Sequence, residues 1–328
     1  MIGCYVTGML PRPKELVELT RAYERGKAGE RELETAFEDA TLKAIKVQSS
    51  AGFAYITDGM LKWQDLLRPF TENLAGVAVG SLSRWFNNNT FYRKPVIVDE
   101  LRREKNIIQN SSYIQLLPKN IPWKAILPAP YTFAQLSENK FYKSNEELMF
   151  TYAKILNDEI KSLVKLGFKY VQLSDPALVY KPFNQSVSKD KIKTVSEALK
   201  VALDGVQIKT CLQTFFGDFC EILPEALDFP VDHLGIDLYE TDLNKLKDYS
   251  FDKGIALGLV DARNSLVEEA DNLIESVKEI VESLHGSKQK DIFVCPNCDL
   301  EFLPWERAQE KIRLIGSVAK RLREELNE

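Results

Sequence analysis

Residues 144–175 read SNEELMFTYAKILNDEIKSLVKLGFKYVQLSD, and this stretch contains one complete helix-to-strand unit. Ser144, with Glu147 three residues later, has the pattern of a capping box at a helix start, and Gly167 is suited to end that helix. The helix then has an apolar stripe at three- to five-residue spacing, made by Leu148, Tyr152, Ile155, Ile160 and Leu163. The stretch predicts a helix over 145–166, a short buried strand from Tyr170, and a polar strand end at Ser174 and Asp175.

The same alternation of short apolar runs and amphipathic helices continues along most of the chain. Eight such units in 328 residues fit a (β/α)8 TIM barrel better than a six-stranded open sheet. The predicted parallel strands are Ile2–Thr7, Ala54–Asp58, Lys124–Leu127, Tyr170–Leu173, Gln207–Gln213, Leu234–Leu238, Ile255–Leu259 and Ile292–Val294.

No low-complexity linker or short-period repeat divides the chain, so residues 1–328 are expected to form a single α/β domain. One long insertion follows the second predicted strand, at about residues 75–122. It contains three consecutive asparagines, 87–89, and a β-rich piece at 91–98. We expect a hairpin excursion there that lies over the barrel mouth. A final helix from about Trp305 closes the outer ring.

Composition excludes several classes of protein. The formal net charge is −5, which argues against a nucleic-acid-binding surface. No apolar run approaches the length of a bilayer span, and the opening residues 1–7 resemble a first strand more than a signal peptide. We therefore expect a cytoplasmic protein with no membrane or nucleic-acid partner. Five cysteines are too few for a disulfide framework and are expected to be reduced thiols.

In a barrel, function resides at the carboxyl ends of the strands, and several polar side chains follow the predicted strands at that point. Four of these are aspartates, and an aspartate that starts a loop can equally cap the helix that follows. As a group, however, they favour a site. The candidates at strand ends are Asp58, Ser174, Asp175, Gln213, Asp237 and Asp261.

The thiols at the last strand suggest metal chemistry less clearly. Cys295 and Cys298 have the spacing of half a tetrahedral zinc site, but a second such pair is missing. Cys211 has the same parity as Gln213 and is expected to point into the barrel one layer lower. The alternative is that the thiols only pack. The two histidines, His233 and His285, are expected to be structural or exposed.

A basic cluster at residues 12–14 follows the first strand. Arg12 and Lys14 could bind an anionic ligand, for example a carboxylate-rich tail, or simply be solvated at a helix start. No glycine-rich phosphate-binding pattern occurs, so a nucleotide cofactor is not indicated.

Several segments along almost the whole chain resemble the cobalamin-independent methionine synthase family, whose enzymes are built from two similar TIM barrels. PRPKEL at 11–16, DGMLKWQD at 58–65, WFNNNTFY at 85–92, LSDPAL at 173–178, TFFGD at 214–218 and LGLVDARN at 257–264 resemble its amino-terminal barrel. PNCDL at 296–300 is closer to its carboxy-terminal, catalytic barrel. The resemblance adds Trp63 and Asn89 to the substrate-binding candidates.

The resemblance implies methyl transfer from a methyltetrahydrofolate to the sulfur of homocysteine, with the thiol bound by zinc. Of the family's four zinc ligands, only Cys298 is retained, because the others fall on Gln213, Phe215 and Asp237. Cys295, Cys211 and Asp237 are the candidates to help Cys298 hold a metal. The homocysteine-binding positions also change, since they fall on Met9, Met60 and Ser174.

The sequence therefore favours a methionine-synthase-related barrel that pairs with a separate, zinc-bearing catalytic barrel. In this reading Lys14 and Arg12 contact the methyl donor, and the catalytic residues of this chain remain unassigned. Two alternatives stay open: an autonomous zinc-dependent thiol S-methyltransferase with a rearranged ligand set, and a non-catalytic binding or scaffold protein. The methyl donor, a folate or a corrinoid carrier, is not decided by the sequence.

Overall fold

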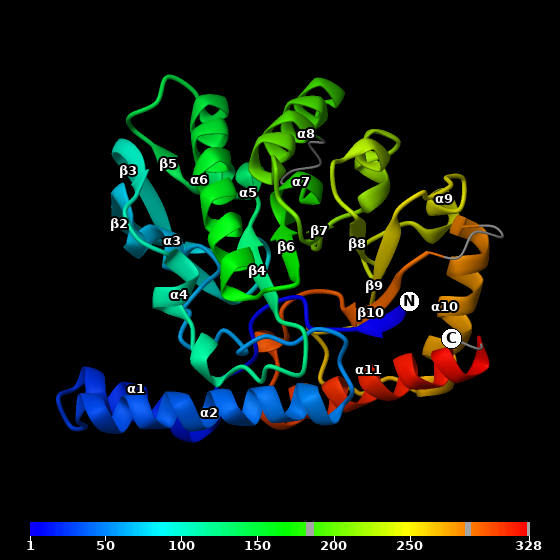
Figure 1. Cartoon of the computed structure of the whole chain (residues 1–328), viewed down its shortest axis with the longest axis horizontal. Coiled ribbons are helices and arrows are strands. Elements are labelled where there is room, and N and C mark those ends of the chain that lie inside the picture. The colour runs from blue at the N-terminus through cyan, green and yellow to red at the C-terminus, as the bar shows by residue number, and fades with distance from the viewer. Residues whose placement is uncertain (182–186, 286–289, 327–328) are drawn as a thin grey trace.

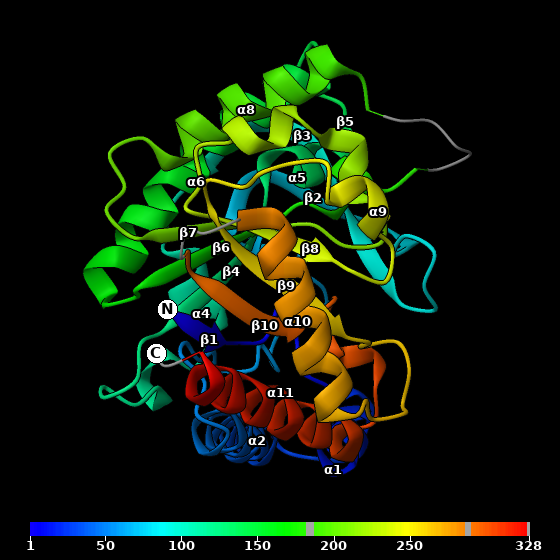
Figure 2. The ribbon, with the colours of Figure 1, turned by 90° about the vertical axis from the view of Figure 1, so that its right-hand side faces the viewer.

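A computed structural model describes residues 1–181, 187–285 and 290–326, and the side chain of His285 lies outside the described part. A curled, parallel seven-stranded sheet forms the centre, with helices packed around its outside (Figures 1 and 2). In sheet order its strands are β1 (Ile2–Cys4), β10 (Ile292–Pro296), β9 (Gly254–Val260), β8 (His233–Asp237), β7 (Lys209–Gln213), β6 (Tyr170–Ser174) and β4 (Lys124–Pro128).

The outer helices follow the strands in chain order. They are α1 (Lys14–Glu24), α2 (Glu30–Ser50), α3 (Arg68–Asn73), α4 (Ile107–Ser111), α5 (Pro130–Leu136), α6 (Asn145–Leu166), α7 (Pro176–Val179), α8 (Lys189–Leu203), α9 (Leu243–Leu246), α10 (Ala270–His285) and α11 (Trp305–Glu325). In the described part of the chain, no helix is long and apolar enough to cross a membrane.

The helix predicted from the capping box is confirmed as α6. The Ser144 hydroxyl accepts a hydrogen bond from the Glu147 backbone N–H at 3.1 Å. Gly167 ends the helix with φ of 105°, a conformation that favours glycine. The predicted apolar stripe is buried along its whole length.

The prediction of a second strand at Ala54–Asp58 is wrong, because no regular strand forms there. In the described part of the chain the central sheet therefore has seven strands, and a closed eight-stranded barrel remains a prediction. Residues 54–56 do touch both edges of the sheet, and we call this region the seam. The Ala54 N–H donates to the Cys4 carbonyl in β1, and Ile56 exchanges bonds with the segment 122–124 at β4. Beyond Ile56, the Thr57 backbone binds the side-chain amide of Gln48 in α2 rather than a neighbouring strand, which explains why the ladder stops.

The predicted hairpin is present as β2 (Leu74–Arg84) and β3 (Phe91–Arg103), which pair antiparallel; β5 (Glu138–Asn139) adds a short third strand. The hairpin stands beside α3 and α6 (Figure 1). Its tip, residues 85–90, extends to loops at the carboxyl ends of the central strands: the Phe86 ring centroid is 5.0 Å from Tyr180 and 5.6 Å from Phe216.

Candidate active site

Three of the four strand-end aspartates are buried, and two of these, Asp58 and Asp175, hold the loops that start beside them. Asp58 accepts backbone N–H groups from Met60 and Tyr113, both at 3.0 Å. Asp175 accepts the Thr132 hydroxyl at 2.6 Å, and its second oxygen has no partner in the described part of the chain. Burial raises the pKa of Asp175 to about 7, so this carboxyl can exchange a proton near neutral pH.

The other two aspartates also organise loops. Asp237 accepts bonds from the backbone N–H groups of Phe216 and Tyr239 and from the side-chain amide of Asn297, all at 3.1–3.2 Å. Burial nevertheless raises its pKa to about 6. Asp261 accepts the Arg263 N–H at 2.9 Å and is partly exposed. The structure therefore arranges these carboxylates around the mouth but gives each one a local structural bond.

Ser174 and Gln213 lie opposite each other on β6 and β7 inside the mouth, and both are buried. The Ser174 hydroxyl accepts the Gln172 amide at 2.9 Å, and that amide also donates to the Thr7 carbonyl. The side-chain oxygens of Gln172 and Gln213 have no partner in the described residues. The inner mouth thus contains two buried neutral amide oxygens, and neither residue lines one of the cavities described below.

The thiols do not gather into one group. Cys211 and Cys295 pack with Tyr5 and Tyr170 deep in the sheet interior, whereas Cys298 belongs to the main apolar core. Burial raises the pKa of the Cys298 thiol well above its ordinary value, and the carboxylates of Asp299 and Asp237 raise it further. This thiol therefore remains protonated at neutral pH.

These residues do not fit a zinc ion. Zinc needs thiolate, imidazole or carboxylate ligands in a tetrahedral arrangement. Phe215 puts a buried ring at one expected ligand position, and Gln213 puts a neutral amide at another. No group of three histidine, cysteine, aspartate or glutamate side chains suited to a metal occurs in residues 1–181, 187–285 and 290–326.

We expect the untagged, chelator-washed protein to contain far less than one zinc per chain by elemental analysis. The triple variant Gln213→His, Phe215→Cys, Asp237→Glu should take up about one zinc, because it supplies imidazole, thiolate and carboxylate ligands beside Cys298. The same triple variant with Cys298→Ser is the control and should bind zinc more weakly. About one zinc per chain in the unaltered protein would contradict the expectation.

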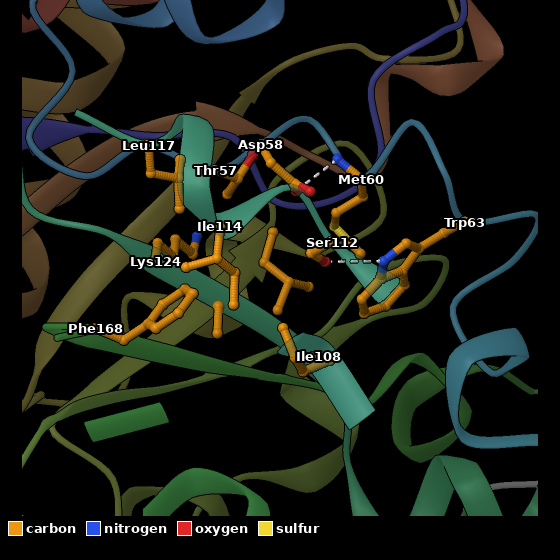
Figure 3. A pocket seen from close by; sticks show the side chains of 12 residues that line it. Thr57, Asp58, Met60, Trp63, Ile108, Ser112, Ile114, Leu117, Lys124 and Phe168 are labelled. Atoms are coloured by element: carbon orange, nitrogen blue, oxygen red, sulfur yellow. Dashed lines mark hydrogen bonds between the residues drawn. The ribbon is translucent and has the colours of Figure 1, made fainter. Parts of the chain in front are cut away.

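Two cavities lie at the loops after β1 and the seam. The smaller one, beside Asp58, Met60, Trp63 and Ser112, measures only about 20 Å³ and cannot hold an amino acid (Figure 3). Trp63 is fixed there by its indole N–H, which donates to the Ser111 carbonyl at 3.0 Å. The side chains in this part of the mouth are therefore closely packed and leave no room for a ligand.

The larger of these two cavities, about 250 Å³, is lined by Met9, Arg12, Met60 and Glu301 among others. The Arg12 guanidinium donates to the carbonyls of Leu61 and Trp63, so two of its five N–H donors already fix a loop. Lys14 is exposed and lies 3.8 Å from Glu18 on its own helix. The structure does not place Lys14 on this cavity, and a role for Arg12 and Lys14 in binding an anionic tail stays a prediction.

A cavity of about 630 Å³ opens beside the hairpin tip. The rings of Phe86, Tyr131 and Tyr180 line it, and Arg84 and Lys191 supply two cations. Its volume is in the range of small-molecule sites. The combination of flat rings and positive charge suits an aromatic ligand that carries an anionic group.

Phe86 takes φ of 50°, and Phe216, with which it is in contact, takes φ of 68°. Large side chains rarely adopt this left-handed region, and such strain concentrates at functional sites. Asn89 lies exposed at the same tip. Sequence reasoning singled out Asn89 but missed Phe86, Tyr131, Tyr180, Arg84 and Lys191; the aromatic pair Trp85-Phe86 beside the asparagines was the one available signal.

A curled parallel sheet that carries polar groups and a cavity of about 630 Å³ at the carboxyl ends of the strands defines the TIM-barrel-like class of α/β proteins. Comparison with known proteins narrows this class. The model of the cobalamin-independent synthase catalytic domain matches residues 3–321, and the chain belongs to this family.

Two curated relatives agree with the family assignment, and two solved structures share the fold. The chain is 30% identical over 326 residues to the methionine synthase of Saccharolobus solfataricus, covering 98% of this chain and 95% of the relative. It is 28% identical over 330 residues to that of Sulfolobus acidocaldarius, covering 98% and 92%. A B12-independent methionine synthase from Shewanella superposes with a TM-score of 0.82 at 22% identity, covering 100% of this chain and 99% of the other. A methyltransferase from Methanosarcina mazei superposes with a TM-score of 0.63 at 12% identity, covering 98% and 94%.

Proposed function

We propose that this chain takes part in methyl transfer from a methyltetrahydrofolate-type donor to homocysteine. It acts as the subunit that holds the donor and works with a separate, zinc-bearing barrel of the same family. The relatives named methionine synthase support the reaction. One observation carries the division of labour: the mouth lacks a zinc ligand set in the described part of the chain, whereas a large aromatic and cationic cavity opens beside it.

The chemistry of the donor fits this cavity. A pterin is flat and aromatic, and the glutamate tail of a folate is anionic. Phe86, Tyr131 and Tyr180 offer ring faces and edges to the pterin, while Arg84 and Lys191 attract the carboxylates. In the overall transfer, the bond from the methyl carbon to the folate nitrogen breaks as a carbon–sulfur bond forms, and the thiol proton ends on that nitrogen.

One carboxyl group close to the cavity, that of Asp175, belongs to this proposal as well. Asp175 lies at the end of β6, directly before α7, which contributes Ala177 to the cavity wall. With a pKa raised to about 7 by burial, its carboxyl is suited to exchange a proton at neutral pH. Asp175 itself is fully buried and is not among the residues that line the cavity, so its part is to position the loop that carries Ala177.

Reconstitution tests the proposal. Methionine formation is measured for this chain alone, for a zinc-loaded methionine synthase barrel encoded by the same genome, and for their mixture. We expect almost no product from this chain alone and at least about a tenfold higher rate from the mixture than from the zinc barrel. An ordinary enzymatic rate from this chain alone overturns the subunit reading. A mixture no faster than the zinc barrel overturns it too.

Donor binding by this chain alone provides a second readout. We expect Phe86→Ala to weaken binding of methyltetrahydrofolate about fivefold, because an aromatic contact of this kind contributes roughly 1 kcal/mol. Isothermal titration of the purified chain measures the effect. Phe141→Ala is the matched control, because Phe141 is an exposed ring outside the cavity. Equal binding by the Phe86 and Phe141 variants would show that the donor does not lie in this cavity.

The cationic side chains of Arg84 and Lys191 should bind the glutamate tail of the donor rather than its pterin ring. Lys191→Ala should weaken a donor with several glutamates more than a donor with one, because only the longer tail offers further carboxylates. The ratio of the two dissociation constants, compared with that of the unaltered chain, checks this. An unchanged ratio would place the tail elsewhere, for example near Arg12 and Lys14.

A further inference from the structure

The short helix α7 begins without the side-chain cap that its own sequence offers. Asp175 is its N-cap residue, and an aspartate at this position normally accepts a backbone N–H from the first turn. Among the described residues, the Asp175 carboxylate makes no such capping bond; it accepts the Thr132 hydroxyl at 2.6 Å. The Ala177 N–H in the first turn donates to the Thr132 hydroxyl oxygen instead, at 3.1 Å. Thr132 belongs to α5, so α7 is capped by a side chain from another helix.

The Thr132 hydroxyl thereby joins two walls of the 630 Å³ cavity. Tyr131 precedes Thr132 in α5, Ala177 lies in α7, and Tyr180 directly follows α7; all three except Thr132 itself line the cavity. The two helices lie side by side (Figure 1). The Tyr180 ring centroid is 5.0 Å from that of Phe86, so the position of α7 also affects the ring at the hairpin tip.

The surroundings make this link between the helices strong. Thr132 and Asp175 are both fully buried, so water does not compete for their hydrogen bonds. The Asp175 backbone N–H donates to the Gln213 carbonyl at 2.8 Å, which anchors the carboxylate to the central sheet. Burial raises the pKa of Asp175, and the bond from the Thr132 hydroxyl acts in the opposite direction, as expected for a bond that favours the ionised carboxylate.

We propose that Thr132 is a positioning residue for the donor cavity: its hydroxyl holds α7 against α5 and so sets the spacing of the Tyr131 and Tyr180 rings. This inference rests on the proposed function, because the ligand that these rings receive is the methyl donor. A hydroxyl is required, since it must donate to Asp175 and accept from Ala177 at the same time. Valine has a similar shape but can do neither, whereas serine can do both.

Amide hydrogen exchange of the full chain without donor tests the link between the helices. We expect Ala177 to exchange at least about tenfold faster in Thr132→Val, because its N–H loses the acceptor. Thr132→Ser should stay close to the unaltered protein. Thr71→Val is the matched control: Thr71 is also buried, but its hydroxyl donates to the Leu67 carbonyl, and it does not line the cavity. Unchanged exchange at Ala177 in Thr132→Val overturns the proposal.

Isothermal titration with methyltetrahydrofolate tests the effect on the cavity. We expect the dissociation constant of Thr132→Val to rise at least about fivefold, as for the loss of one aromatic contact. Thr132→Ser and Thr71→Val should stay within about twofold of the unaltered chain. Faster exchange at Ala177 together with an unchanged dissociation constant overturns the positioning role. If the unaltered chain binds no donor, the proposed donor site is wrong, whereas the exchange result still decides whether Thr132 holds α7.

A second pair of variants removes the other partner of the Thr132 hydroxyl and serves if Thr132→Val does not fold, which urea unfolding shows. Asp175→Asn keeps an oxygen that can accept the hydroxyl, whereas Asp175→Leu has a similar size and no acceptor. We expect Asp175→Leu to weaken donor binding and to speed exchange at Ala177 more than Asp175→Asn does. Equal effects of the two substitutions would contradict a role through the Thr132 hydroxyl.

Discussion

Glu159→Ala is expected to destabilise the protein by about 3–5 kcal/mol, since it removes one partner of a buried ion pair. Glu159 is fully buried on α6, and its carboxylate accepts the Arg103 guanidinium at 2.6 Å. It also accepts the backbone N–H groups of Ile107 and Ile108 at the start of α4, at 3.0 and 2.8 Å. One carboxylate thus ties the end of the hairpin and the following helix to the outer layer.

Urea unfolding checks this prediction, and hydrogen exchange shows where the loss begins. We expect faster exchange first in residues 103–108, which lose their common acceptor. Glu18→Ala is the control, because Glu18 forms only an exposed pair with Lys14 and should change stability by less than about 0.5 kcal/mol. A loss below about 1 kcal/mol for Glu159→Ala would show that the pair contributes little.

Lys124→Met is expected to change the pH dependence of stability strongly, because it removes a buried amine from the interior of the sheet. Lys124 is fully buried, donates to the Val6 carbonyl at 2.9 Å, and lies 3.2 Å above the Tyr5 ring centroid. Burial lowers its pKa to about 7, although the neighbouring thiols of Cys211 and Cys295 act in the opposite direction. The amine is therefore largely neutral in the folded protein above pH 7.

The sign of the effect follows from proton binding. Between pH 7 and about pH 10 the unfolded lysine holds a proton that the folded one lacks, so this group makes stability rise with pH. The slope reaches about 1.4 kcal/mol per pH unit, or about 4 kcal/mol from pH 7 to pH 10. The advantage of the Lys124→Met variant over the unaltered protein should therefore be greatest near pH 7 and shrink as pH rises.

The difference between the two proteins is the quantity to measure, because buried cysteines and tyrosines titrate in the same range with the opposite sign. Their contributions largely cancel when the urea unfolding curves of both proteins are compared at each pH. Lys14→Met is the control, since it makes the same chemical change at an exposed position outside the sheet. A pH-independent difference for Lys124→Met would mean that the amine stays charged in the fold.

The sequence predicts the strands well because parallel strands are buried on both faces and are therefore apolar throughout. Predicted Tyr170–Leu173 is observed as Tyr170–Ser174, and predicted Ile292–Val294 as Ile292–Pro296. The segment after Ala54 fails as a strand for a reason that lies outside it. Gln48 on α2 supplies the hydrogen bonds that a neighbouring strand would have supplied, and no local pattern reveals this.

The site is predicted less completely than the fold. Residues at strand ends, such as Asp237, are visible in the sequence because the barrel topology fixes where they meet. The 630 Å³ cavity is not visible, because its wall joins the hairpin tip at Phe86 to Tyr131 in α5 and to Tyr180 after α7. Only tertiary contact brings these rings together, and their spacing in the sequence carries no common period.

The seam has a consequence for motion. Elsewhere neighbouring strands of the central sheet are joined by ladders, but at the seam three backbone bonds at Ala54, Ile56 and Lys124 connect the two edges. Local opening requires the least free energy where the fewest bonds must break together. The seam can therefore open locally while the other strands stay paired. Such local opening would move the loop with Asp58 and Met60. The loop after the seam is thus the part of the mouth that moves at the lowest cost in free energy. A ligand or partner that binds this loop would reduce the opening of the seam.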